Sequence, residues 1–260
     1  MDKKIQVAAI VVAIVFSVLV LTSPTDPIPL PLPNSNSESD FVTILAENLD
    51  KPRAIAVSND RIFVTEKDGA IKVIQNNTLL DSPLATLRGA DVFDGGLLGI
   101  ALHPNFSTNH YMYVFLTYEE DDNLWNKILR ITESENKLQN AETILDKIPG
   151  SSFTNGGFMK FGPDEKLYVG TGTVSDASHL PQDLNSLSGK ILRLNDDGTI
   201  PDDNPFLNSH VYSLGHRNPQ GMTWDDNGNL FVAEFGPEKN DEINLIQAGK
   251  NYGWPEEQCS

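Results

Sequence analysis

The chain has 260 residues, of which 19 are basic and 36 acidic, so its formal net charge is −17. This charge argues against a nucleic-acid-binding protein, because such proteins contact phosphates through an excess of lysine and arginine. Charged residues make up only 21% of the chain and hydrophobic residues 39%, which is not the composition of a disordered polyanion. The single cysteine, Cys259, excludes a disulfide framework and a cysteine-built metal site within the chain.

The N-terminal part predicts an export segment followed by a spacer. Two lysines precede an apolar run over residues 7–21, and the residues after this run make a poor cleavage site. We therefore assign residues 1–23 to a targeting segment whose hydrophobic helix, residues 5–21, is an uncleaved membrane anchor, with a cleaved signal peptide as the alternative. The remainder of the chain is expected on the extracytoplasmic side. Residues 24–40, rich in proline and then serine, predict an extended linker.

After the linker, one pattern occurs four times: a strand, a turn rich in Asn, Asp, Gly or Pro, a short apolar strand, a loop and a further strand. The apolar strands contain Val64, Val114, Val169 and Val232, which are 50, 55 and 63 residues apart. Short strands at this period predict the blades of a β-propeller, so residues 41–260 are expected to form an all-β domain. A closed four-bladed ring is one alternative, but an incomplete propeller of about four blades is more economical, because no closing strand follows the fourth repeat. The further strands are expected at residues 71–74, 127–131, 190–194 and 242–246.

Two segments carry unusual polar chemistry. Arg217 lies in the tight turn Gly215-His216-Arg217-Asn218-Pro219, where its guanidinium could bind a carboxylate. The second segment, residues 234–255, offers main-chain carbonyls at Gly236-Pro237 and then acidic and phenolic side chains. Hard oxygen donors of this kind suit calcium. Dinucleotide, phosphate-loop, zinc-helix and nucleophile-elbow motifs are not found.

Four ordered motifs resemble those of the soluble sugar dehydrogenases that depend on pyrroloquinoline quinone (PQQ), the glucose/sorbosone dehydrogenase family. They are GGLLGIALHP (95–104), GKILRLNDDGTIP (189–201), GHRNPQG (215–221) and GP…DEINLI…NYGWP (236–255). The resemblance extends from about residue 41 to residue 255. It implies a six-bladed propeller that binds the quinone over a calcium ion (Ca2+) in its central channel. It also implies hydride transfer from an aldose sugar to the quinone and an external acceptor for the electrons.

The resemblance assigns candidate site residues motif by motif. The implied residues are Arg217 and Asn218 for the quinone, Gly236 and Pro237 for its calcium ion, Asp241, Glu242 and Tyr252 for a second, structural calcium site, and Asp94 for the substrate pocket.

The chain departs from the family pattern where the chemistry is concentrated. The family's histidine base, in a stretch like His-Asn-Gly-Gly-Arg, is replaced by Thr154, and Phe158 stands where that stretch has arginine. A threonine hydroxyl is not a base near neutral pH. Thr173 replaces a family carboxylate, and the downstream third of the family pattern is absent. Three interpretations therefore stay open: an exported, membrane-anchored sugar dehydrogenase, an inactive propeller that binds carbohydrate or protein at the cell surface, and a gene fragment.

Overall fold

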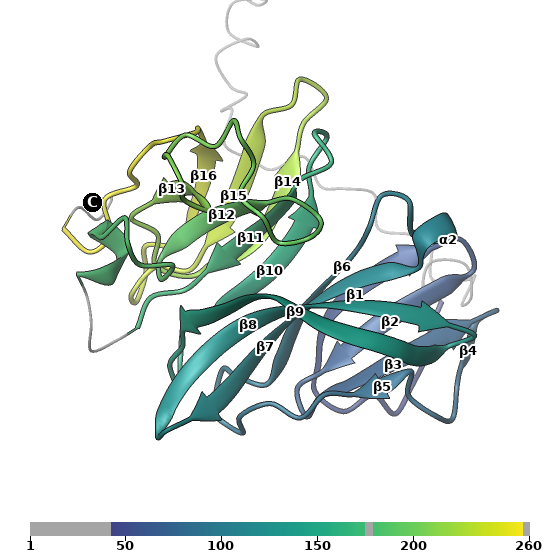
Figure 1. The fold of residues 1–260 in the computed structure, drawn as a ribbon. Helices are drawn as coiled ribbons and strands as arrows, with labels where there is room; N and C mark the ends of the chain where they lie inside the picture. Colours follow the sequence, from purple (N-terminus) through teal and green to yellow (C-terminus); the bar gives the residue numbers. More distant parts are fainter. Residues whose placement is uncertain (1–42, 175–178, 257–260) are drawn as a thin grey trace, which may run out of the picture. The chain divides into compact units, whose positions relative to one another are not determined.

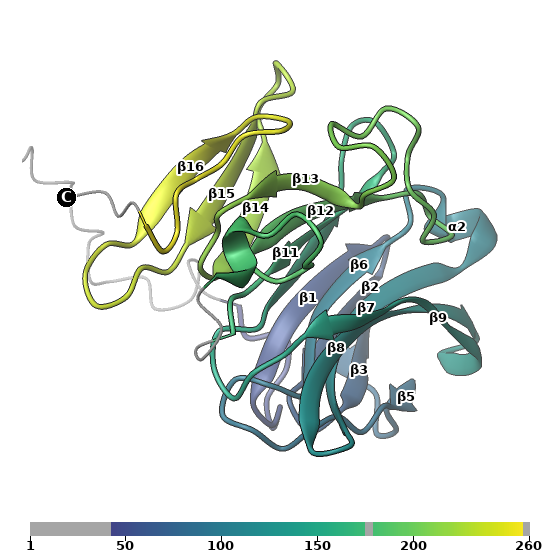
Figure 2. The ribbon, with the colours of Figure 1, turned by 60° about the vertical axis from the view of Figure 1, so that its left-hand side comes forward.

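The computed structural model describes residues 43–174 and 179–256. From Ile44 onward the chain forms one unit, built almost entirely of β-strands (Figures 1 and 2). The described strands form four antiparallel sheets in which strand order follows chain order. The first strands of successive sheets pack side by side. This four-blade arrangement confirms the predicted all-β propeller. The predicted N-terminal helix, the linker and the domain boundaries before residue 41 lie outside the described residues.

No helix within the described parts of the chain is both long and apolar enough to cross a membrane.

Blade 1 packs one face of its sheet against blade 2. Because successive strand residues point to opposite faces, Phe63, Ile71 and Val73 all enter a core that they share with Leu97 and Val114 of blade 2. Burial of these side chains is the main source of stability in such a fold. The strands of blade 1 are β1 (Pro52–Ser58), β2 (Arg61–Glu66), β3 (Ala70–Gln75), β4 (Thr78–Leu79) and β5 (Ala85–Thr86).

Blade 2 contains the longest hairpins. Its second and third strands are joined by Asp121 and Asp122, whose φ values of 52° and 59° lie in the left-handed region that a two-residue hairpin turn requires. Short polar residues such as aspartate tolerate this region better than most. The elements of blade 2 are β6 (Leu97–Leu102), α2 (Phe106–Asn109), β7 (Tyr111–Glu120), β8 (Asn123–Ser134) and β9 (Lys137–Pro149).

Blades 3 and 4 repeat the same layering. Tyr113 and Phe115 of blade 2 pack with Val169 and Leu192 of blade 3. A third core joins blade 3 to blade 4 through Tyr168, Ile191, Met222 and Val232. The elements of blade 3 are β10 (Gly156–Phe161), β11 (Leu167–Thr171), the 3₁₀-helix η1 (Leu180–Gln182), β12 (Lys190–Leu194) and β13 (Val211–Leu214), and those of blade 4 are β14 (Pro219–Trp224), β15 (Leu230–Glu234) and β16 (Glu242–Ile246).

The strands expected from the repeat pattern are confirmed as the second and third strands of each blade. The strand that the pattern places before each turn is also found, as the first strand of each blade: β1, β6, β10 and β14. These strands carry glycine or proline where a strand usually carries bulky residues. The close packing of these strands explains the composition. A Cβ atom on Gly99 of β6 would overlap the main-chain carbonyl oxygen of Gly157 of β10. Small residues thus allow neighbouring first strands to approach.

Lys190 is a charged side chain buried inside blade 3. Its Nζ donates hydrogen bonds to the carbonyl oxygens of Leu180 (2.8 Å), Pro181 (2.9 Å) and Ser188 (2.7 Å), and so ties η1 to β12. Burial lowers the pKa of Lys190 to about 7, although the nearby Asp183 carboxylate acts in the opposite direction. The amine is therefore only partly protonated in the folded protein near neutral pH.

We expect this lysine to make stability depend on pH. In the unfolded chain an ordinary lysine keeps its proton to about pH 10, so between pH 7 and 10 the unfolded state binds more protons. The free energy of unfolding should therefore rise with pH, by up to about 1.4 kcal/mol per pH unit. Lys190→Met should remove that component and also lower the free energy of unfolding by about 2–3 kcal/mol, because three carbonyl groups lose their donor.

Urea unfolding of both proteins at pH 7 and pH 9 measures this difference. Lys137 is exposed, so Lys137→Met is the matched control and should keep the wild-type pH slope. The same slope in wild type and Lys190→Met would show that the buried amine does not titrate in this range.

Candidate functional site

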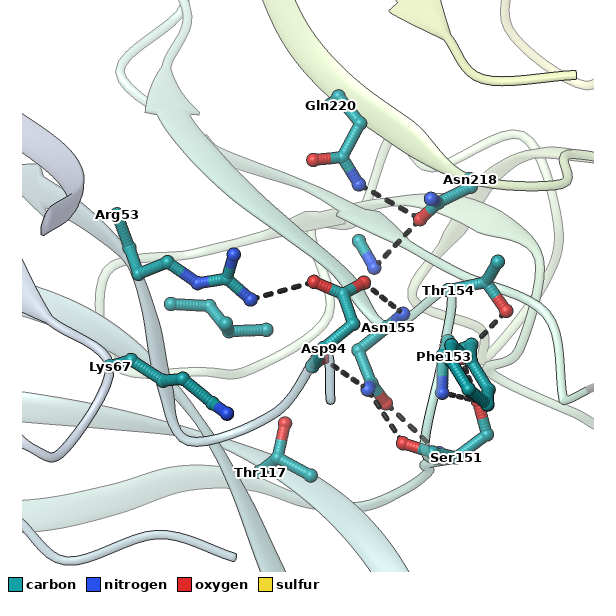
Figure 3. A network of polar contacts seen from close by, with 12 residues as sticks. Arg53, Lys67, Asp94, Thr117, Ser151, Phe153, Thr154, Asn155, Asn218 and Gln220 are labelled. Carbon is teal, nitrogen blue, oxygen red and sulfur yellow. Dashed lines mark hydrogen bonds and ion pairs between the residues drawn. The ribbon is translucent and has the colours of Figure 1, made fainter. Parts of the chain in front are cut away.

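Polar side chains from all four blades meet where the first strands begin. Arg53 lies at the start of β1, while Asp94, Asn155 and Asn218 directly precede β6, β10 and β14 or lie a few residues before them. Arg53 Nη2 lies 2.7 Å from Asp94 Oδ1, and Asn155 Nδ2 donates to the main-chain carbonyl of Asp94 at 2.6 Å. The amide N–H of Gly156 donates to Asn218 Oδ1 at 3.1 Å. Figure 3 shows these polar contacts from close by.

Asn155 is the centre of this network and is almost completely buried. Besides the bond to Asp94, its Nδ2 donates to the carbonyl of Ser151 at 2.7 Å. Its Oδ1 accepts from the Ser151 amide at 3.0 Å and from Asn126 Nδ2 at 3.1 Å. Asn126 Oδ1 in turn accepts from the hydroxyl of Thr117 at 2.7 Å. The sequence analysis did not identify Asn155. The signal that could have indicated it is its place between Thr154 and the two glycines with which the first strand of blade 3 begins.

Asp94 is held in one orientation by the groups around it. Its Oδ1 accepts from Arg53, and its Oδ2 accepts from the main-chain N–H of Asn155 at 3.4 Å. The Asp94 amide also donates to the carbonyl of Ser152 at 2.9 Å. The Asp94 and Arg53 side chains keep 24% and 30% of their surface exposed, so both can contact a ligand. Arg53 was likewise not identified from the sequence.

Thr154, the residue expected at the position of the family's histidine, has an unusual conformation. Its φ of 58° lies in the left-handed region, which β-branched residues rarely adopt. Its hydroxyl lies 2.8 Å from the carbonyl oxygen of Thr173 and 2.7 Å from that of Phe153. The Thr173 hydroxyl is buried and has no hydrogen-bond partner among the described residues. Residue 154 therefore supplies a neutral hydroxyl, not a base.

The guanidinium group of Arg217 is held by two main-chain carbonyls and an aromatic ring. Nη1 donates to the carbonyl oxygens of Phe235 at 2.9 Å and Gly236 at 2.5 Å. The guanidinium carbon lies 5.3 Å from the ring centre of Trp254, which is a cation–π distance. Burial lowers the pKa of Arg217, and the Glu234 and Asp241 carboxylates act against this shift. The side chain stays charged at any physiological pH, because an arginine pKa begins above 12.

One cavity of about 410 Å3 is lined by Arg53, Asp94, Thr154, Arg217 and Asn218, and its volume lies within the usual range for cofactor and ligand sites. The cavity brings together the predicted quinone residues, the predicted substrate residue and the position of the missing base, although these lie in different blades. At its wall, the rings of Phe93 and Phe153 are 5.0 Å apart and tilted by 40°. The lining residues are Arg53, Phe93, Asp94, Phe153, Thr154, Arg217, Asn218, Gln220, Phe235, Gly236, Glu238 and Asp241.

The residues expected to bind calcium divide between two places. Gly236, Pro237, Glu242 and Tyr252 line a small cavity of about 20 Å3, whereas Asp241 lines the larger cavity. Asp241 Oδ1 accepts from the Gly236 amide at 2.9 Å.

Two of these side chains also have protein partners. The Glu242 carboxylate accepts from Asn244 at 3.2 Å, and the Tyr252 hydroxyl donates to the Leu245 carbonyl at 2.7 Å. The described residues contain no group of three or more His, Cys, Asp or Glu side chains placed to hold a metal ion.

Comparisons with known proteins agree with this architecture. A family model described as glucose/sorbosone dehydrogenase matches residues 49–260. The chain is 37% identical to quinoprotein glucose dehydrogenase B of Acinetobacter calcoaceticus over 82% of this chain and 52% of that protein. It is 34% identical to an aldose sugar dehydrogenase of Escherichia coli, over 82% of this chain and 61% of that protein.

A solved structure of an aldose sugar dehydrogenase from Streptomyces coelicolor, in its PQQ-bound form, superimposes with a TM-score of 0.78 at 39% identity. The match covers 84% of this chain and 66% of that one. The chain thus spans about half the length of the first curated relative that it matches.

Proposed function

Because the chain belongs to the glucose/sorbosone dehydrogenase family, we propose that it contains the quinone- and sugar-binding wall of an aldose sugar dehydrogenase. The observation that carries the proposal is the cavity in which Arg217, Asn218 and Asp94 meet. The two sequence relatives described above are sugar dehydrogenases, so sugar oxidation is supported for the family. For this chain the cofactor, the external electron acceptor, export and the membrane anchor at residues 5–21 are parts of the proposal.

The residues present fit a planar, carboxylate-bearing ligand such as PQQ. Arg217 presents a guanidinium group to the cavity, and a guanidinium binds a carboxylate through two parallel hydrogen bonds. The Asn218 amide lies at the same wall. When bound, the quinone would supply an acceptor for the hydride on C1 of an aldose. The protein's part is to bind and orient both molecules and to keep water from the reacting atoms.

Asp94 and Arg53 would hold the sugar. A carboxylate fixed by Arg53 keeps lone pairs free to accept sugar hydroxyl groups, and the remaining N–H groups of Arg53 can donate to the next oxygen. The Gln220 amide is a third polar group at this wall. Because Asp94 and Arg53 are held in place before binding, they lose little conformational entropy when the sugar binds, and the affinity is higher for that reason.

Calcium fits less completely than the quinone. The ion takes six to eight oxygen ligands, and near Gly236 the described residues offer mainly main-chain carbonyl oxygens, one of which already accepts from Arg217. A calcium ion at this place would need further oxygen ligands from the bound quinone or from additional protein residues.

Thr154 favours a second candidate function, that of a non-catalytic propeller that binds carbohydrate or protein at the cell surface. Its hydroxyl cannot take the proton of the sugar's C1 hydroxyl group, and the nearest polar atoms are carbonyl oxygens. The binding residues of the cavity would then serve recognition alone.

We expect the chain to bind PQQ saturably, and Arg217→Met to weaken binding about 10- to 100-fold through loss of a charge-assisted pair. Titration followed by quenching of protein fluorescence measures the affinity. Dye reduction with several aldoses in the presence of calcium then measures turnover. Arg88 is exposed and does not line the cavity, so Arg88→Met should bind like the wild type. Absence of saturable binding to the wild type would overturn the proposed function.

A further inference from the structure

A chain of buried polar groups lies directly behind Arg217. Ser213 Oγ is 2.8 Å from His216 Nε2, and His216 Nδ1 is 2.9 Å from Glu234 Oε2. Ser213 and His216 have no exposed surface, and Glu234 keeps only 7%. The order of groups is that of a hydrolase triad. No substrate can reach a hydroxyl that has no exposed surface, so this arrangement has another use.

Glu234 uses its other carboxylate oxygen on Arg217. Oε1 accepts a hydrogen bond from the Arg217 main-chain N–H, while the next two carbonyl groups along the chain, of Phe235 and Gly236, accept from the Arg217 guanidinium. The end of β15 therefore holds both the backbone and the side chain of Arg217. The Arg217 carbonyl oxygen is also engaged, by the amide of Thr173 at 2.8 Å.

His216 holds the other oxygen of the Glu234 carboxylate. Its ring stacks on Tyr252 with centroids 4.7 Å apart and an interplanar angle of 22°, so it cannot turn away from Glu234. A carboxylate can accept from both His216 and the Arg217 amide, because it is an acceptor at both oxygens. The Glu234 side chain is thus the link between a rigid buried ring and the residue that faces the cavity.

We propose that Glu234, held by His216 and Ser213, is a positioning residue that presets Arg217 to bind a carboxylate-bearing ligand. The identity of that ligand rests on the proposed function, whereas the positioning of Arg217 can be tested without it. A guanidinium held in place before binding gains affinity, because the ligand does not have to order a long side chain.

Glu234→Gln tests the proposal, because glutamine keeps the shape of the side chain. Its amide has only one oxygen, so it can no longer accept hydrogen bonds at both positions, from His216 and from the Arg217 main-chain N–H. We expect PQQ affinity to fall about 10- to 30-fold, as for the loss of one well-placed hydrogen bond to a charged group. The matched control is Glu133→Gln. Glu133 is equally buried, pairs with Arg61 at 2.9 Å in blade 2 and lies away from the cavity. This control should lower the melting temperature comparably and leave the affinity unchanged.

A second measurement is independent of the quinone. Hydrogen exchange of the Arg217 amide, observed by NMR, should accelerate at least tenfold in Glu234→Gln and stay at the wild-type rate in Glu133→Gln. Ser213→Ala is a smaller change and should accelerate exchange of the Arg217 amide about threefold with the fold intact. If Glu234→Gln does not fold, Ser213→Ala is used in its place.

The outcomes separate the two proposals. Failure of the wild type to bind PQQ would overturn the proposed function, while accelerated exchange at Arg217 would still support the positioning role. Wild-type exchange at Arg217 in Glu234→Gln, or in Ser213→Ala when it is the variant used, would overturn the positioning role. So would a PQQ affinity that Glu234→Gln lowers no more than Glu133→Gln does.

Discussion

Replacing Asn155 by alanine is expected to lower the free energy of unfolding by about 4 kcal/mol, because several buried groups lose their partner at once. The carbonyl oxygens of Asp94 and Ser151 lose a donor, and the amides of Ser151 and Asn126 lose an acceptor. A buried polar group left without a partner costs about 1–3 kcal/mol, and these groups lie in one network. Because the network joins β6 and β10, the effect should extend to the cavity.

Urea unfolding followed by circular dichroism measures the change. Asn140 is exposed on β9, so Asn140→Ala should stay within about 0.5 kcal/mol of the wild type. Asn155→Ala should also loosen Asp94, because it removes the side-chain hydrogen bond to the Asp94 main-chain carbonyl. A loss of less than about 1 kcal/mol in Asn155→Ala would mean that water replaces the amide at little cost.

Thr154→His is expected to raise the rate of sugar oxidation by the PQQ-loaded chain about 10²- to 10⁴-fold, the usual contribution of a general base. The cavity wall at residue 154 is shared with Arg217, Asn218 and Asp94, so an imidazole there would face the proposed sugar and quinone positions. The backbone favours the change. Histidine tolerates the left-handed φ of 58° better than β-branched threonine does.

Dye reduction with glucose and other aldoses measures this gain. Thr154→Gln is the matched control, because it adds a long polar side chain without a base and should leave the rate low. In Thr154→His the rate should increase with pH and level off above about pH 6.5, since only the neutral imidazole accepts a proton. Retained PQQ binding with no gain in turnover would favour the non-catalytic propeller.

Local pattern alone was sufficient to predict the blades. The second and third strands of each blade are short apolar runs between turn residues, as around Val169 and over Lys190–Leu194, and the structure confirms them. Such strands are specified by neighbours in the sequence, because alternation and turn chemistry act within a few residues. The same rules do not explain the glycines of β6 and β10, because Gly99 and Gly157 serve the packing between strands of different blades.

Motif resemblance identified several residues that line the cavity, including Thr154 and Arg217, but not those that hold them in place. The network joins residues 41, 61 and 62 positions apart, in the Arg53–Asp94, Asp94–Asn155 and Gly156–Asn218 contacts. A repeat period gives the number of blades but not the partner of a side chain in the next blade.

What the sequence by itself determined is therefore the all-β repeat and the family, since both depend on short-range patterns. Only the tertiary structure decided that Arg53 pairs with Asp94, that Asn155 links the blades, and that Glu234 and His216 support Arg217. These contacts arise because the first strands of all four blades begin beside one another, and their flanking residues come within hydrogen-bonding distance only when the blades have packed.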